Sequence, residues 1–145
     1  MAIAQAVCNS FKKEILEGIH DLENGGDTFK LALYESTANL SAATTAYPGD
    51  STGGQVANTG QYVQGGGTLA SQQTSLDTGV AIVDFADLSF TGVTLTARGA
   101  LIYNSTESDK AVAVLDFGGD KTATAGTFTI QFPDFNSTSA ILRIS

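Results

Sequence analysis

Hydrophobic positions near the start of the chain recur at the spacing of an α-helix. Between residues 3 and 22, apolar side chains fall mostly three or four positions apart, and charged side chains fall between them. This spacing puts the apolar residues, Phe11 and Ile15 among them, on one face of an amphipathic helix. The Asn-Gly-Gly string at 24–26 tolerates the left-handed backbone that follows a helix end. We therefore predict one N-terminal helix over residues 3–23.

The hydrophobic period then changes to two, which is typical of half-buried strands. Residues 28–34 alternate in this way and form the first predicted strand. Further strands are predicted at 80–85, 88–90, 93–97, 99–104, 111–117, 127–132 and 140–144. The polar residues 105–109 between two of them suit a hairpin turn. Short strands without intervening helices favour an antiparallel β-sandwich or barrel-like fold. We expect a single, mainly β domain over residues 1–145, with its main β region at 80–145.

The segment 41–75 has a different composition, rich in Gly, Ser and Thr. Its sizeable apolar residues are few: Tyr47, Val56, Tyr62, Val63 and Leu69. Irregular segments of this length are uncommon inside compact domains and are usually functional or ordered by a partner. We expect an extended loop or arm, with weak strands at 61–64 and 68–71, that packs little by itself and lies on a neighbouring subunit. The alternative is a surface loop without a role.

The charge balance excludes two classes of partner. Seven Lys and Arg against 15 Asp and Glu give a net charge of −8 in 145 residues, so no basic surface is expected for nucleic acid or anionic membranes. Hydrophobic residues make up 42% of the chain, too many for a disordered acidic segment, and no apolar run approaches the roughly 18 residues of a membrane span. We predict a folded chain without nucleic-acid or membrane partners.

Few residues in the chain are suited to catalysis or metal binding. The single Cys8 cannot form an intramolecular disulfide, and no basic stretch at the N-terminus suggests export, so we expect folding in the cytoplasm. We predict that Cys8 is a buried thiol and that His20, the only histidine, is not catalytic. One His and one Cys do not supply a nucleophilic triad or a zinc site. The Gly run at 65–67 precedes no helix, so it is not a phosphate loop.

Carboxylates are the one chemical group in surplus. Their spacing matches no calcium loop, and Asp residues at strand ends mostly make turn hydrogen bonds. Asp84 and Asp116 each precede a Phe at the end of an apolar strand, and Arg98 is the expected partner of either if it is buried. A hydrolase built on paired Asp residues is the open alternative. We predict no enzyme, no cofactor and no metal.

Several strand-forming strings carry a resemblance to a known group of proteins. The sequence is similar to small virion structural proteins of tailed bacteriophages over nearly its whole length, weakening between 35 and 75. The strings that carry the similarity lie at 1–6, 26–34, 94–105, 110–121, 128–133 and 140–144. They form the fold rather than a catalytic motif.

The resemblance implies a non-enzymatic structural protein located in the virion and made in the host cytoplasm. The favoured role is capsid decoration, in which a cement protein bridges and stabilises major capsid subunits as a homo-oligomer, with a trimer favoured. The alternative is a tail, neck or fibre-base component. A carbohydrate-binding module is a further class, disfavoured by the lack of Trp. The residues expected to contact other proteins are Phe11, Ile15, Tyr47, Tyr62, Val63 and Leu69.

Overall fold

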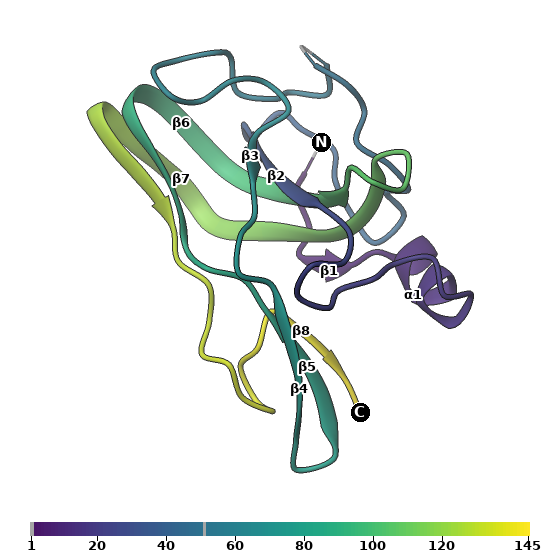
Figure 1. The fold of residues 1–145 in the computed structure, drawn as a ribbon. Coiled ribbons are helices and arrows are strands. Elements are labelled where there is room, and N and C mark those ends of the chain that lie inside the picture. The colour runs from purple at the N-terminus through teal and green to yellow at the C-terminus, as the bar shows by residue number, and fades with distance from the viewer. Residues whose placement is uncertain (1, 51) are drawn as a thin grey trace.

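The computed structural model describes residues 2–50 and 52–145 (Figure 1). Met1, in the opening string, and Ser51, in the 41–75 segment, lie outside the described residues. The predicted fold class is confirmed, since strands hold 47% of the chain and helix only 6%, with all strands antiparallel in two sandwich-like sheets and one short helix near the N-terminus.

The larger sheet is built around one long hairpin. β6 (Leu88–Asn104) and β7 (Lys110–Ile130) pair along their length, and the predicted turn at 105–109 joins them. β2 (Phe29–Tyr34) pairs with the other edge of β6, and β3 (Gly67–Thr68) follows β2. β6 joins three predicted strands and β7 joins two, because register shifts, one of them between Ala97 and Gly99, bend the hairpin without ending its pairing.

The centre of this sheet is the core of the molecule. β2 and the adjoining parts of β6 and β7 are almost wholly buried, so successive side chains are apolar on both faces. Leu31, Leu101 and Val112 are 0% exposed. These strands match the continuous apolar strings of the sequence, as expected for central strands.

The predicted helix over residues 3–23 is wrong at both ends. α1 covers only Asn9–Leu16, and before it β1 (Ala6–Val7) pairs with the free edge of β7, which satisfies backbone groups that a helix would have used internally. At its other end, Gly18 adopts φ +72° while its N–H bonds to the Ile15 carbonyl and the Ile19 N–H bonds to that of Glu14. This is a Schellman cap, so Gly18 rather than the string at 24–26 ends the helix.

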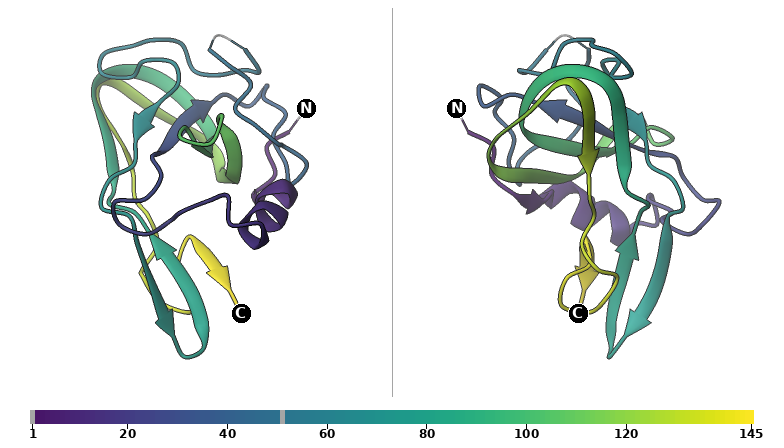
Figure 2. Two further views of the ribbon diagram at one scale, coloured as in Figure 1. Left: turned by 45° about the vertical axis from the view of Figure 1, so that its right-hand side comes forward. Right: turned by 90° about the vertical axis from the view of Figure 1, so that its left-hand side faces the viewer.

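The smaller sheet has the order β4-β5-β8 and projects from the rest of the molecule (Figures 1 and 2). β4 (Gln73–Asp77) and β5 (Val80–Asp84) form a hairpin, and β8 (Leu142–Ile144) pairs with β5. The register aligns Leu76, Ala81 and Ile144 in one row across the sheet, and the neighbouring row on the same face holds Thr74, Val83 and Leu142.

The expectation that segment 41–75 packs little by itself is wrong. Val56, Tyr62 and Leu69 join the core of the same chain, and the Val56 N–H bonds to the Leu33 carbonyl of β2. At Gly66 the segment comes so close to β2 that a Cβ atom there would overlap the Leu31 carbonyl. These few apolar residues are enough to hold the segment on the sheet, because each is buried and makes a backbone hydrogen bond. Of the weak strands predicted here, β3 overlaps 68–71, while 61–64 holds only an isolated bridge at Tyr62.

Candidate interaction surfaces

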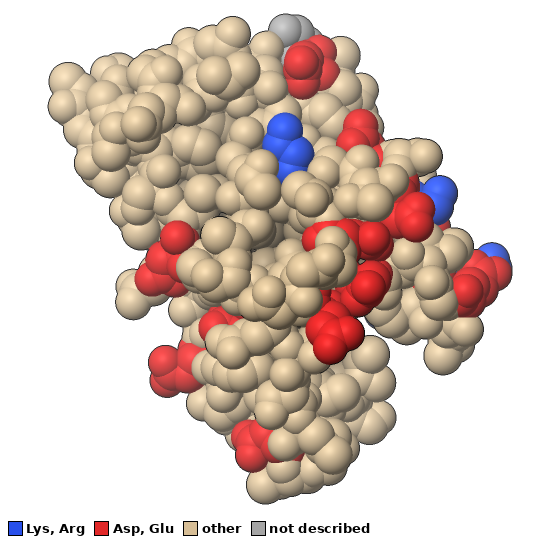
Figure 3. Space-filling model, viewed as in Figure 1, with Lys and Arg blue, Asp and Glu red and all other residues tan. Residues whose placement is uncertain are grey.

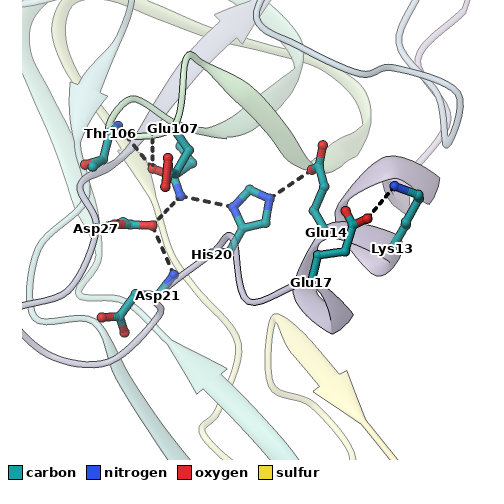
Figure 4. A network of polar contacts seen from close by, with 9 residues as sticks. Lys13, Glu14, Glu17, His20, Asp21, Asp27, Thr106 and Glu107 are labelled. Carbon is teal, nitrogen blue, oxygen red and sulfur yellow. Dashed lines mark hydrogen bonds and ion pairs between the residues drawn. The ribbon is translucent and has the colours of Figure 1, made fainter.

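The only histidine is enclosed in a polar network that joins three separate parts of the chain (Figure 4). His20 Nε2 lies 2.9 Å from Glu14 Oε1, and His20 Nδ1 lies 3.0 Å from Asn104 Nδ2. The amide of Asn104 also donates to Asp27 Oδ2, at 2.8 Å. Because an amide nitrogen only donates, Nδ1 of His20 accepts and Nε2 carries the proton that it donates to Glu14.

The orientation of Asn104 is fixed from its other side. Its Oδ1 accepts the backbone N–H groups of Thr106 and Glu107 in the hairpin turn, at 3.1 and 3.3 Å. The Phe11 ring packs against the His20 ring at a tilt of 49°, with centroids 4.7 Å apart, and the His20 side chain has no exposed surface. Both ring nitrogens are used within the chain, so the network holds the segment after α1 on the hairpin turn rather than presenting a base to a substrate.

Cys8 is buried, as predicted from the sequence. It is 0% exposed, and burial, as the largest cause, raises the pKa of its thiol to about 11. A thiol with a raised pKa is mostly protonated near neutral pH and is a poor nucleophile.

The carboxylates singled out from the sequence lie in different sheets. Asp116 on β7 accepts a hydrogen bond from Arg98 Nε at 2.9 Å, the pairing expected, and this contact lowers the pKa of the carboxyl. Asp84 on β5 has no contact with Arg98, and its buried Oδ1 has no hydrogen-bond partner. Among the described residues, no group of three or more His, Cys, Asp or Glu side chains is arranged to hold a metal ion.

Three of the residues expected to contact other proteins lie inside this chain instead. Phe11, Tyr62 and Leu69 are at most 4% exposed and belong to the core cluster, which accounts for their apolar character without a partner. Ile15 and Tyr47 are half-buried against the core. Val63 is 60% exposed. The surface available to another protein therefore involves other residues as well.

All four tyrosines of the chain gather where the long loop meets the larger sheet. The Leu33 N–H donates to the Tyr62 hydroxyl at 2.8 Å, and that hydroxyl donates to Gln55 Oε1 at 3.0 Å. Gln55 Nε2 donates to the Tyr47 hydroxyl, and the Tyr47 ring stacks on Tyr103. These contacts fix the loop to the sheet. Burial is the largest cause of the raised pKa of each of the four tyrosines.

An open apolar groove of about 470 Å³ lies between α1 and the smaller sheet. Its apolar walls come from one face of α1 and from the sheet face defined above: Phe11, Ile15, Leu16, Ala81, Val83, Leu142 and Ile144. Leu16 is 89% exposed and Ile144 57% exposed, while Leu76, in the same row as Ile144, is 72% exposed. Three of the four exposed large hydrophobic side chains in the described structure thus lie at or beside this groove, and contiguous exposed apolar surface is typical of an interaction site.

The charge at the groove differs from that of the rest of the molecule. Lys12 and Arg143 are the charged residues of its described lining, and the guanidinium of Arg143 bonds to the Thr138 carbonyl, which does not line the groove. Elsewhere carboxylates outnumber cations, as one face illustrates (Figure 3). Sequence analysis missed the groove, although Leu16 at the end of an amphipathic helix was a signal for it.

Comparison with models of protein families, with curated proteins and with solved structures finds no match to this chain. Within residues 2–50 and 52–145, no helix is long and apolar enough to cross a membrane.

Proposed function

We propose that the chain is a non-enzymatic structural protein of a tailed-bacteriophage virion, and that its role is capsid decoration. The observation that carries the proposal is the resemblance of its strand-forming strings to small virion proteins. Those strings overlap β1, β2, the second half of β6, both ends of β7, and β8.

The proposed mechanism is adhesion. Packaged DNA presses a capsid outward, and a protein that bridges major capsid subunits lowers the free energy of the closed shell by burying surface across their joints. A rigid β-sheet scaffold with an exposed apolar groove suits this task. The acidic charge of −8 suits the outer surface of a head, away from packaged DNA. The proposed partners are the major capsid protein and further copies of the chain, in a trimer.

The surface proposed for these contacts differs from the one expected from sequence. Phe11, Tyr62 and Leu69 are buried, so the proposed contacts move to Leu16, Ile144 and the neighbouring exposed face of the smaller sheet. Val63, on the long loop, remains a proposed contact because it is exposed.

Copy number tests the proposal. Quantitative mass spectrometry of gradient-purified virions measures copies of this chain relative to the major capsid protein. A ratio near one, or a simple fraction of the capsid lattice, is the expected result. A few to a few dozen copies per particle would favour the alternative, a tail, neck or fibre-base component. Absence from the virions would contradict both.

A further inference from the structure

We propose that His20 is a pH-sensitive latch: a second proton on its imidazole ring expels the ring from between α1 and the turn that joins β6 to β7, and so loosens α1 from that turn. The inference concerns the fold of the chain itself and does not depend on the proposed function. It rests on the hydrogen bonds that enclose the ring and on the burial of its side chain (Figure 4).

The ring has no place for a second proton while the network is intact. Nε2 already carries the proton that it donates to Glu14 Oε1, so an added proton has to go to Nδ1. Nδ1 lies 3.0 Å from the amide nitrogen of Asn104, which is itself a donor. A protonated Nδ1 would therefore direct one N–H donor at another, in a site where the His20 side chain has no exposed surface.

Asn104 cannot resolve this conflict by turning its amide around. Its Oδ1 accepts the backbone N–H groups of Thr106 and Glu107, and its Nδ2 donates to Asp27 Oδ2. An exchange of oxygen and nitrogen would direct a donor at both N–H groups and an acceptor at the carboxylate. Three hydrogen bonds would be lost for the one gained with His20. Asn104 is 0% exposed, so water does not replace them.

The charged groups that face the ring do not remove the conflict. Glu14 of α1 contacts Nε2, and Asp27, which precedes β2, is joined to the ring only through the Asn104 amide. The aromatic neighbours of the ring, Phe11 of α1 and Phe29 of β2, are uncharged. Both carboxylates attract positive charge, but neither is hydrogen-bonded to Nδ1, where the proton would be added.

Acidification therefore favours a state in which the ring has left the network. Histidine gains its charge between about pH 5 and 8, whereas carboxylates are protonated nearer to about pH 4. The enclosed ring excludes a proton that a ring in water binds. Opening thus takes up one proton and becomes up to about tenfold more favourable for each unit by which the pH falls. Because Phe11 of α1 packs on the ring, the departure of the ring removes a contact that holds α1 on the hairpin turn.

NMR of the isotope-labelled full chain tests the latch. His20 is the only histidine, so its two ring nitrogens give one unambiguous pair of signals. Hydrogen exchange of the α1 amides is followed between about pH 8 and 5, as protection factors that correct for the intrinsic effect of pH. His20→Gln serves as the control, because a glutamine side chain offers a donor and an acceptor but takes up no proton.

At about pH 8 the ring should carry its proton on Nε2 alone. On acidification the doubly protonated ring should appear only together with loss of the native Asn104 side-chain signals. Protection in α1 should fall at least about tenfold in the wild-type chain and stay constant in His20→Gln.

The proposal is overturned if Nδ1 carries the proton at neutral pH, or if the ring takes its second proton while the Asn104 signals are unchanged. It is also overturned if the ring stays neutral and α1 stays protected throughout this range. These outcomes are read on the unmodified chain, so they decide the question even if His20→Gln does not fold. An equal loss of protection in a folded His20→Gln chain would contradict the proposal too, since another group would then cause the opening.

Discussion

The two sheets of this protein differ in how completely they bury their own side chains. The centre of the larger sheet is buried on both faces, and the long loop is bound to it through hydrogen-bonded tyrosines. The smaller sheet carries an exposed apolar row on the face that forms the groove. Both are antiparallel and belong to one chain, so the difference lies in what covers each sheet. The centre of the larger sheet is covered by the chain itself, and the smaller sheet leaves an apolar row exposed.

High pH should have the largest effect, and it should act through the larger sheet. Burial raises the pKa of Tyr47 to about 12 and raises those of Tyr34, Tyr62 and Tyr103 further above the ordinary value of 10.0. The folded state therefore holds protons that the unfolded chain releases above about pH 10, so stability is full below that pH and falls as pH rises toward and through 12. Absorbance at 295 nm and far-UV circular dichroism follow the transition.

We expect tyrosinate to appear in one cooperative step, together with the loss of β-structure. Because all four tyrosines lie at the larger sheet, gradual ionisation near pH 10 with the circular dichroism unchanged would contradict the described burial.

The next largest difference in stability is expected between two leucine substitutions, one in each sheet. Leu101→Ala removes a side chain that is 0% exposed in β6 and should lower the free energy of unfolding by about 2 to 5 kcal/mol. Leu76→Ala, at a position 72% exposed in β4, should change it by less than about 0.5 kcal/mol. Urea unfolding of both variants measures the difference. Equal losses would mean that Leu76 is buried in the protein alone.

Removing the Asn104 network should have the next largest effect on the free energy of unfolding. Asn104→Ala removes the partner of His20 Nδ1, Asp27 Oδ2 and two backbone N–H groups, so a loss of about 3 kcal/mol is expected. Asn24→Ala, at an exposed position, is the control and should change stability by less than about 0.5 kcal/mol. Thermal unfolding followed by calorimetry makes the comparison. A neutral Asn104 variant would mean that the network contributes little to folding.

Two tyrosine hydroxyls should give the smallest effects, with different signs. Tyr62→Phe leaves the Leu33 N–H without its partner and should cost about 1 to 2 kcal/mol. The buried Tyr34 hydroxyl has no hydrogen-bond partner in the described structure, so Tyr34→Phe should be neutral or stabilising. Chemical unfolding of both variants tests this. A destabilised Tyr34 variant would indicate a partner for its hydroxyl.

Sequence patterns predicted the parts of the fold that depend on local alternation. The strand at 28–34 and the hairpin turn at 105–109 follow from residue types over short stretches. Arg98 was expected to pair with Asp84 or Asp116, and the structure selects Asp116. The predicted helix was too long because apolar spacing alone does not show that Ala6–Val7 forms a strand instead of a helix. Gly18 was the available stop signal.

The groove could not be predicted from the sequence, for a different reason. It depends on the register that aligns Leu76, Ala81 and Ile144, three residues far apart in the sequence. The contact residues chosen from the sequence were large apolar side chains, and tertiary packing buries Tyr62 and Leu69 within the chain itself. Size and hydrophobicity do not by themselves distinguish a core residue from an interface residue.

Hydrogen exchange followed by mass spectrometry tests the contrast between the sheets most directly. It is measured on the full chain without any partner. In the chain alone, amides of β2 and the paired regions of β6 and β7 should exchange only through global unfolding, while those of β4 and β8 exchange through faster local opening. Equal protection of both sheets would contradict the account.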